Sequence, residues 1–229
     1  MSILQGLLVD TEPAAEQVRT TEVREQVQPM AVSRTGSAHN DQIRALVQQL
    51  FFRHESRVRH VGFAAVEPST ATAALCFDVA RTLAAGYRYD VGLIDARTES
   101  TMLQEELQIP PSRRGEANWP IAPRLWMVPR QNWFHEADGE GVTDENLSRL
   151  REVTTEFDFC ILCCAPVSWL TASIGRTCDG LVLVLSANKT RRIVAAQIKN
   201  QLNRAQVPLL GSVLAERRFP VPQGLYRSL

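Results

Sequence analysis

The chain has no excess of either charge and no long apolar run. Lys plus Arg number 25 and Asp plus Glu number 25, so no electrostatic attraction to nucleic acid or to an anionic membrane is expected. No apolar run approaches the roughly 20 residues that span a bilayer. The first residues, "MSILQGLLVDTEP", have no basic segment and reach Asp10 early, unlike a secretory signal. We therefore expect a cytoplasmic protein without nucleic-acid binding or membrane insertion.

The five cysteines are not expected to form disulfides or to bind a metal. All lie in or beside apolar runs, which suits buried, reduced thiols. "CILCC" over 160–164 has zinc-like spacing but lies in an apolar segment expected to be a strand. There Cys160 and Cys164 would share one face and Cys163 the other. No metal site is predicted.

Residues 1–39 also lack aromatic side chains. The segment is polar and rich in Thr, Glu and Gln, so we predict a flexible arm, followed by a domain over 40–229. Asn40 is placed to cap a helix that runs to about Phe52, with Ile43, Val47 and either Leu50 or Phe51 on its apolar face.

The rest of the domain alternates between two periodicities. Helical spacing relates the apolar residues Leu75, Val79 and Leu83, then Leu147, Leu150 and Val153, and finally Val194, Ile198 and Leu202. Strands are predicted over 59–65, 89–95, 124–129, 158–164, 180–186 and 209–215. The span 108–142 is rich in turn residues, and surface loops around one strand are expected there. Apolar strands that alternate with helices predict an α/β fold: a three-layer, doubly wound, mainly parallel sheet of the P-loop NTPase type. A site would lie at the carboxyl ends of its strands.

The loop after the first strand has neither glycine nor lysine between Val66 and Leu75. A phosphate loop needs glycines to curl around phosphate, a lysine for its oxygens and a hydroxyl for magnesium. Here Ser69 and Ala71 stand at glycine positions, with Thr70 between them. Thr72 stands at the lysine position and Ala73 at the hydroxyl position. Glu67 adds a negative charge beside the expected phosphates, so the loop is predicted not to bind ATP.

Several motifs, in this order, resemble one bacterial family. "VGLIDART", "LWMVP" and "FDFCILCCAPV" follow the loop. The most specific match is "CDGLVLVLSANKTRRIVAAQIKNQLNRAQVPLLGSVL", and the ending "ERRFPVPQGLYRSL" also fits. Over about residues 40–229 the chain resembles the tyrosine-autokinase and chain-length-regulator proteins of polysaccharide export. These belong to the deviant P-loop class that includes the partitioning ATPases.

The chain departs from that family at the groups that do chemistry. Asp95 matches the first aspartate of the family's second-strand signature, but Arg97 replaces the next one. The Walker B aspartate falls on Cys163, and a thiol is a poor magnesium ligand. We therefore predict no catalytic residues, no ATP or magnesium cofactor, and a pseudoenzyme. The alternative is a nucleotide-binding regulatory switch with weak or absent hydrolysis. A partitioning-type positioning protein is disfavoured.

The resemblance implies a function by binding. It indicates an accessory protein of exopolysaccharide or capsule synthesis and export, with an inner-membrane chain-length or export protein as its partner. That partner would bring it to the membrane surface; self-association is a further option. One expected surface is the 41–52 helix, where Asp41 and Arg44 match a family contact pattern and Val47 extends the apolar face. The other is a docking tail whose anchors are Phe219, Leu225 and Tyr226.

Overall fold

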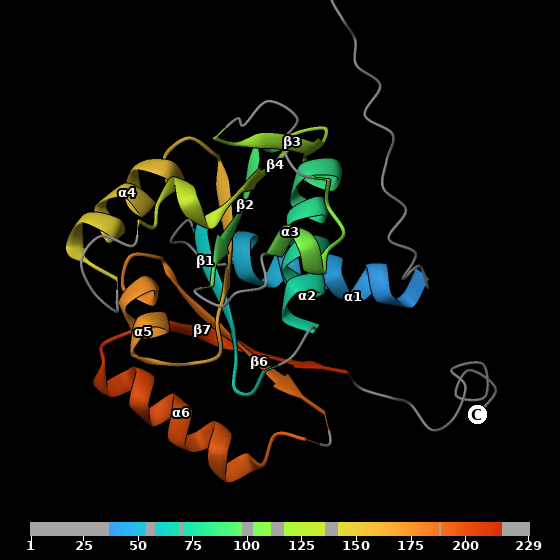
Figure 1. Cartoon of the computed structure of the whole chain (residues 1–229). Helices are drawn as coiled ribbons and strands as arrows, with labels where there is room; N and C mark the ends of the chain where they lie inside the picture. The colour runs from blue at the N-terminus through green and yellow to red at the C-terminus, as the bar shows by residue number, and fades with distance from the viewer. Residues whose placement is uncertain are drawn as a thin grey trace, which may run out of the picture.

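A computed structural model describes residues 37–53, 58–68, 71–97, 103–110, 117–135, 142–187 and 189–216. One seven-stranded sheet, ordered β3-β4-β2-β5-β1-β6-β7, runs through the molecule (Figure 1). Its strands are β1 (His60–Ala65), β2 (Val91–Ala96), β3 (Trp119–Ala122), β4 (Leu125–Val128), β5 (Phe159–Cys164), β6 (Gly180–Ser186) and β7 (Leu209–Ala215). All neighbours pair in parallel except β3 with β4. The predicted α/β class and mainly parallel sheet are confirmed.

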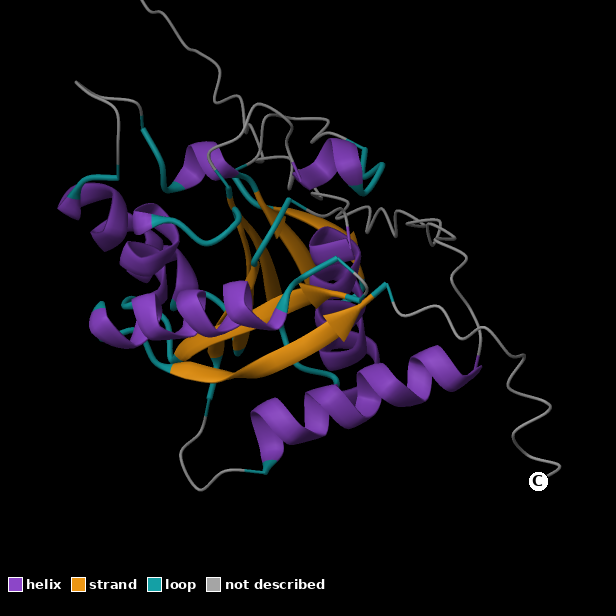
Figure 2. Cartoon of the chain, turned by 90° about the horizontal axis from the view of Figure 1, so that it is seen from below, coloured by secondary structure: helices purple, strands orange, loops and turns teal. Residues whose placement is uncertain are grey.

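Helices cover both faces of the sheet (Figure 2). One core joins the sheet to α1 (Ser37–Val47), its π-helical extension η1 (Gln48–Phe52), α2 (Ala71–Arg81), the π-helical turn η2 (Thr82–Gly86) and α3 (Leu103–Glu106). The other core joins it to Trp133 and Phe134, which follow the short helix η3 (Arg130–Asn132), and to α4 (Asp144–Thr154), α5 (Trp169–Gly175) and α6 (Arg192–Arg204). No helix of the described residues is long and apolar enough to cross a membrane.

The central strands form because both of their faces are apolar. Every residue of β2 and β5 is buried, and only the first residue of β1 is partly exposed. Strands buried on both faces need nearly continuous apolar sequence, which is the pattern that predicted them. Leu75, Val79 and Leu83 are all buried against these strands, as their spacing indicated.

Three local predictions need correction. The 108–142 span holds two strands, not one: β3 and β4 form an antiparallel hairpin, and Pro120 is tolerated because β3 is an edge strand. Helix α1 begins at Ser37, so Asn40 lies inside it instead of capping it. Residues 37–39 form the first turn of this helix, and residues 1–36 of the predicted arm lie outside the described part of the chain. Helices α3 and α5 were not foreseen because each is too short to show a period.

Candidate functional site

The candidate site lies where β1, β2 and β5 end. Cys163 of β5 is in register with Phe63 of β1 and with Asp95 of β2, so the parallel sheet places Asp95 and Cys163 side by side. Helix α2 begins at Ala71, just after the loop that follows β1. The topology thus brings together the predicted loop, strand-end aspartate and Walker B position. Ser69 and Thr70 lie outside the described residues, while Glu67 is partly buried.

Both carboxylate oxygens of Asp95 have partners within the chain. Oδ1 accepts hydrogen bonds from the backbone N–H and the Nε–H of Arg97, at 3.2 and 3.1 Å. Oδ2 accepts one from the backbone N–H of Leu103, at 2.7 Å, where α3 begins. Asp95 therefore connects the end of β2 to the beginning of α3.

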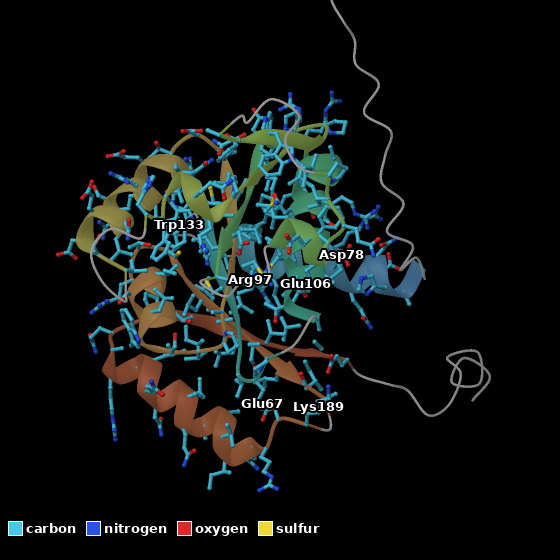
Figure 3. The ribbon with its side chains drawn as sticks, viewed as in Figure 1. Glu67, Asp78, Arg97, Glu106, Trp133 and Lys189 are labelled. Carbon is cyan, nitrogen blue, oxygen red and sulfur yellow. The ribbon has the colours of Figure 1, made fainter. Side chains whose placement is uncertain are left out.

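Arg97 joins Asp95 to a second carboxylate. Its Nη1 donates to Oε2 of Glu106 at 2.5 Å, and the two side chains lie next to each other in Figure 3. The Arg97 side chain is 10% exposed and that of Asp95 is 4% exposed. Burial by itself would lower the pKa of Arg97. The charge of Asp95, together with hydrogen bonds to Asp95 and Glu106, outweighs it and raises that pKa above its ordinary value. Arg97 is therefore a fixed buried cation.

Trp133 supports this cluster from the other face of the sheet. The indole is fully buried, and its Nε1–H donates to the backbone carbonyl of Asp95 at 2.9 Å. Sequence reasoning recorded Arg97 only as a departure from the family and missed Glu106 and Trp133. The charge at position 97 was a visible signal, but nothing in the sequence indicated that positions 106 and 133 would meet it.

The other predicted pocket residues offer no oxygen cluster for a cation. Thr72 is 4% exposed, and its Oγ1 has no hydrogen-bond partner. Ala73 and Cys163 are buried in the same core. Among the described residues, no group of three or more His, Cys, Asp or Glu side chains could hold a metal ion. Magnesium prefers an octahedron of oxygen ligands, and Ala73 and Cys163 supply none while Asp95 is already engaged. The residues present do not fit a magnesium–nucleotide site.

The cysteines are separated between the two cores. Cys160 and Cys164 lie in the core beneath α4 and α5, and Cys163 lies with Cys76 in the core beneath α2. This confirms the predicted alternation of faces. Burial raises the pKa of the Cys76, Cys160 and Cys164 thiols, and it raises that of Cys178 to about 12. These cysteines are therefore protonated thiols at neutral pH, not thiolate ligands.

The predicted surface on α1 is only partly present. Asp41 and Arg44 are exposed, but Val47 is fully buried together with Ile43 and Leu50. The apolar face of this helix packs on the domain's own core, so Val47 cannot contribute to a partner surface. Phe219, Leu225 and Tyr226 lie outside the described residues.

Comparisons with solved structures identify the fold. The kinase domain of the Escherichia coli tyrosine kinase ETK superposes with a TM-score of 0.66 at 15% identity, over 85% of this chain and 83% of that one. The kinase domain of VpsO gives 0.62 at 14% identity, over 80% and 98%. A ParA family ATPase from Chlorobium tepidum gives 0.51 at 14% identity, over 68% and 73%. No protein-family model and no curated protein matches the chain. The chain has the P-loop NTPase-like fold that these kinase domains and ATPases share.

Proposed function

We propose that the protein is a catalytically inactive relative of these kinases and ATPases that acts by binding other proteins. The observation that carries the proposal is the buried Asp95–Arg97–Glu106 cluster at the carboxyl end of β2. Phosphoryl transfer depends on positioned positive charge and on a metal held by oxygen ligands. In this chain the cation that directly follows β2, Arg97, is engaged by the chain's own carboxylates.

The setting proposed for this binding is bacterial exopolysaccharide or capsule synthesis and export. It rests on the motif resemblance over residues 40–229 and on the shared fold with bacterial tyrosine kinase domains such as that of ETK. The proposed partner is an inner-membrane chain-length or export protein, which would hold this protein at the cytoplasmic side of that membrane. The exposed Asp41 and Arg44 on α1 are the described residues proposed to contact a partner or a second copy.

Calorimetric titration with ATP and ADP, with and without magnesium, tests the loss of nucleotide binding. For the parent chain we expect no affinity tighter than about millimolar, or about −4 kcal/mol. A Thr72→Lys, Ala73→Thr, Cys163→Asp variant restores the missing groups and serves as the matched comparison. Micromolar, magnesium-dependent binding by the parent chain would contradict the proposal.

A second candidate is a nucleotide-binding regulatory switch, and one observation favours it. Two buried donors at this edge, Thr72 Oγ1 and Arg97 Nη2, have no hydrogen-bond partner. A buried donor without a partner is costly, and an anion would satisfy it. The switch predicts nucleotide binding without magnesium that Thr72→Val abolishes and Thr72→Ser retains. Equal, weak titrations for the parent and both variants would exclude it.

A further inference from the structure

Strand β7 has an open edge. It is the last strand of the sheet, with β6 on one side and no described strand on the other. Its sequence, "LLGSVLA", has no charge and no proline, and Leu214 is 54% exposed. Natural proteins usually protect such edges with charges, prolines or a covering segment. Something is therefore expected to cover β7.

The direction of the free backbone groups follows from one hydrogen bond. The carbonyl of Ala215 accepts from the N–H of Ala187, the residue after β6, so the backbone groups of Ala215 point toward β6. Because backbone direction alternates along a strand, those of Val213 do the same. The N–H and C=O groups of Ser212 and Leu214 then point to the open edge.

A groove of about 300 Å³ runs beside this edge. One side of the groove is lined by Leu46 of α1, Leu50 of η1 and Arg53, which follows η1. The other side is lined by Leu210, Gly211 and Val213 of β7. A Cβ atom built on Gly211 would meet no atom within 4 Å, so the space above this glycine is open. The open edge and the open space lie on the same strand.

The segment that follows β7 has the alternation needed to pair with it. Glu216 has a φ of 57°, the left-handed conformation found in tight hairpin turns. Because the Ala215 carbonyl is bonded to Ala187, the first pair that can close a hairpin on the open edge involves Leu214. A four-residue turn at 215–218 would place Phe219 opposite Leu214 and Val221 opposite Ser212. Pro220 and Pro222 would then stand opposite Val213 and Gly211, whose backbone groups point to β6.

We propose that residues 218–223 of this chain fold back as an antiparallel strand on the open edge of β7. The N–H groups of Phe219 and Val221 meet the free carbonyls of β7, and the two prolines, which have no N–H, face outward. Proline is tolerated on edge strands in this orientation, and it prevents a further strand from adding. The Pro222 ring lies over the open space at Gly211, and Phe219 covers the exposed Leu214.

Hydrogen exchange of the Ser212 and Leu214 amides tests the pairing, because both are free in the strand as described. In the full chain we expect both amides to exchange at least about tenfold more slowly than in a chain ending at residue 216. Val221→Pro removes a donor that faces β7 and should release both amides. Pro220→Ala, the matched control, adds an N–H that faces outward and should leave them protected. Circular dichroism checks that each variant keeps its fold.

Equal exchange of the two amides in the full and shortened chains would overturn the proposal. The same holds if protection falls on dilution together with the mass measured by light scattering, because the covering strand then comes from a second copy. Loss of protection in Pro220→Ala but not in Val221→Pro would refute the register. These outcomes do not depend on nucleotide binding, so the proposed function is tested separately.

Discussion

The carboxyl end of β2 and the open edge of β7 differ in whether their polar groups have partners. At β2, the buried side chains of Asp95 and Arg97 pair with each other, and Arg97 also pairs with the partly buried Glu106, at the edge of the sheet where this fold places ligands. At β7, the backbone groups of Ser212 and Leu214 have no strand beside them among the described residues, and Leu214 is exposed. The difference is that the side chains at the end of β2 already have partners within the chain, whereas the edge of β7 needs a segment to cover it.

The largest expected effect comes from removing the cation at β2. Arg97→Met keeps most of the side-chain volume but leaves the carboxylates of Asp95 and Glu106 without their partner. Unbalanced buried charges of this kind cost about 3–5 kcal/mol, and urea unfolding should show that loss. Arg124→Met is the control, because the Arg124–Asp90 pair is about half exposed on both sides and should contribute less than about 1 kcal/mol. Similar losses of unfolding free energy in both variants would show that the Arg97 pairs contribute no more to stability than an exposed ion pair.

Two strand glycines differ in the space around them: Gly180 is tightly packed and Gly211 is not. A Cβ at Gly180 of β6 would lie 2.9 Å from the carbonyl oxygen of Pro208 and 2.7 Å from Leu210 Cγ, whereas one at Gly211 meets nothing within 4 Å. Gly180→Ala should destabilise the fold by about 1–3 kcal/mol because the backbone must shift. Gly211→Ala should stabilise it by about 0.5–1 kcal/mol by reducing the freedom of the unfolded chain. Chemical denaturation of both variants measures the two effects.

Much of the fold could be predicted because the central strands are apolar on both faces. Apolar runs such as "DVGLIDA" and "DFCILCC" favour one structure, a parallel strand buried between two layers of helices. That structure also places Asp95 next to Cys163, as the register shows. The helices that were not predicted are the short ones: α3 has four residues and α5 has seven. Such pieces are held by tertiary contacts, and their own sequence shows no period.

For the site, the sequence predicts that a lysine, a hydroxyl and a carboxylate are absent at Thr72, Ala73 and Cys163, and this interpretation stays a prediction. The contacts of Arg97 and Asp95 could not be predicted, because they involve Glu106, nine residues from Arg97, and the distant Trp133. Val47 shows the converse error: an apolar helix face was interpreted as a partner surface, yet it packs on the domain's own sheet.

A smaller effect is expected from His60, which begins β1. Burial lowers the pKa of His60 below its usual value of 6.5; the charge of Asp179 opposes the shift, and that of Arg59 adds to it. The unfolded chain then binds the proton more readily than the folded one. Stability is therefore complete above about pH 6.5 and declines as the pH falls below that value. Urea midpoints on either side of this pH should differ in the parent chain and differ less in His60→Asn. An identical acid decline in both would assign the effect to other groups.

The smallest effect on stability is expected at the exposed face of α1. Arg44 and Asp41 are exposed, and the helix contacts the core through Ile43 and Val47 instead. Arg44→Glu should change the free energy of unfolding by less than about 0.5 kcal/mol. If the Asp41–Arg44 face binds a neighbour, the same variant lowers the mass measured by light scattering or the recovery of the membrane partner in a pull-down. Gln42→Glu adds the same charge type at an exposed neighbouring position and serves as the control. Unchanged mass and unchanged partner recovery in Arg44→Glu would show that the Asp41–Arg44 face binds neither neighbour.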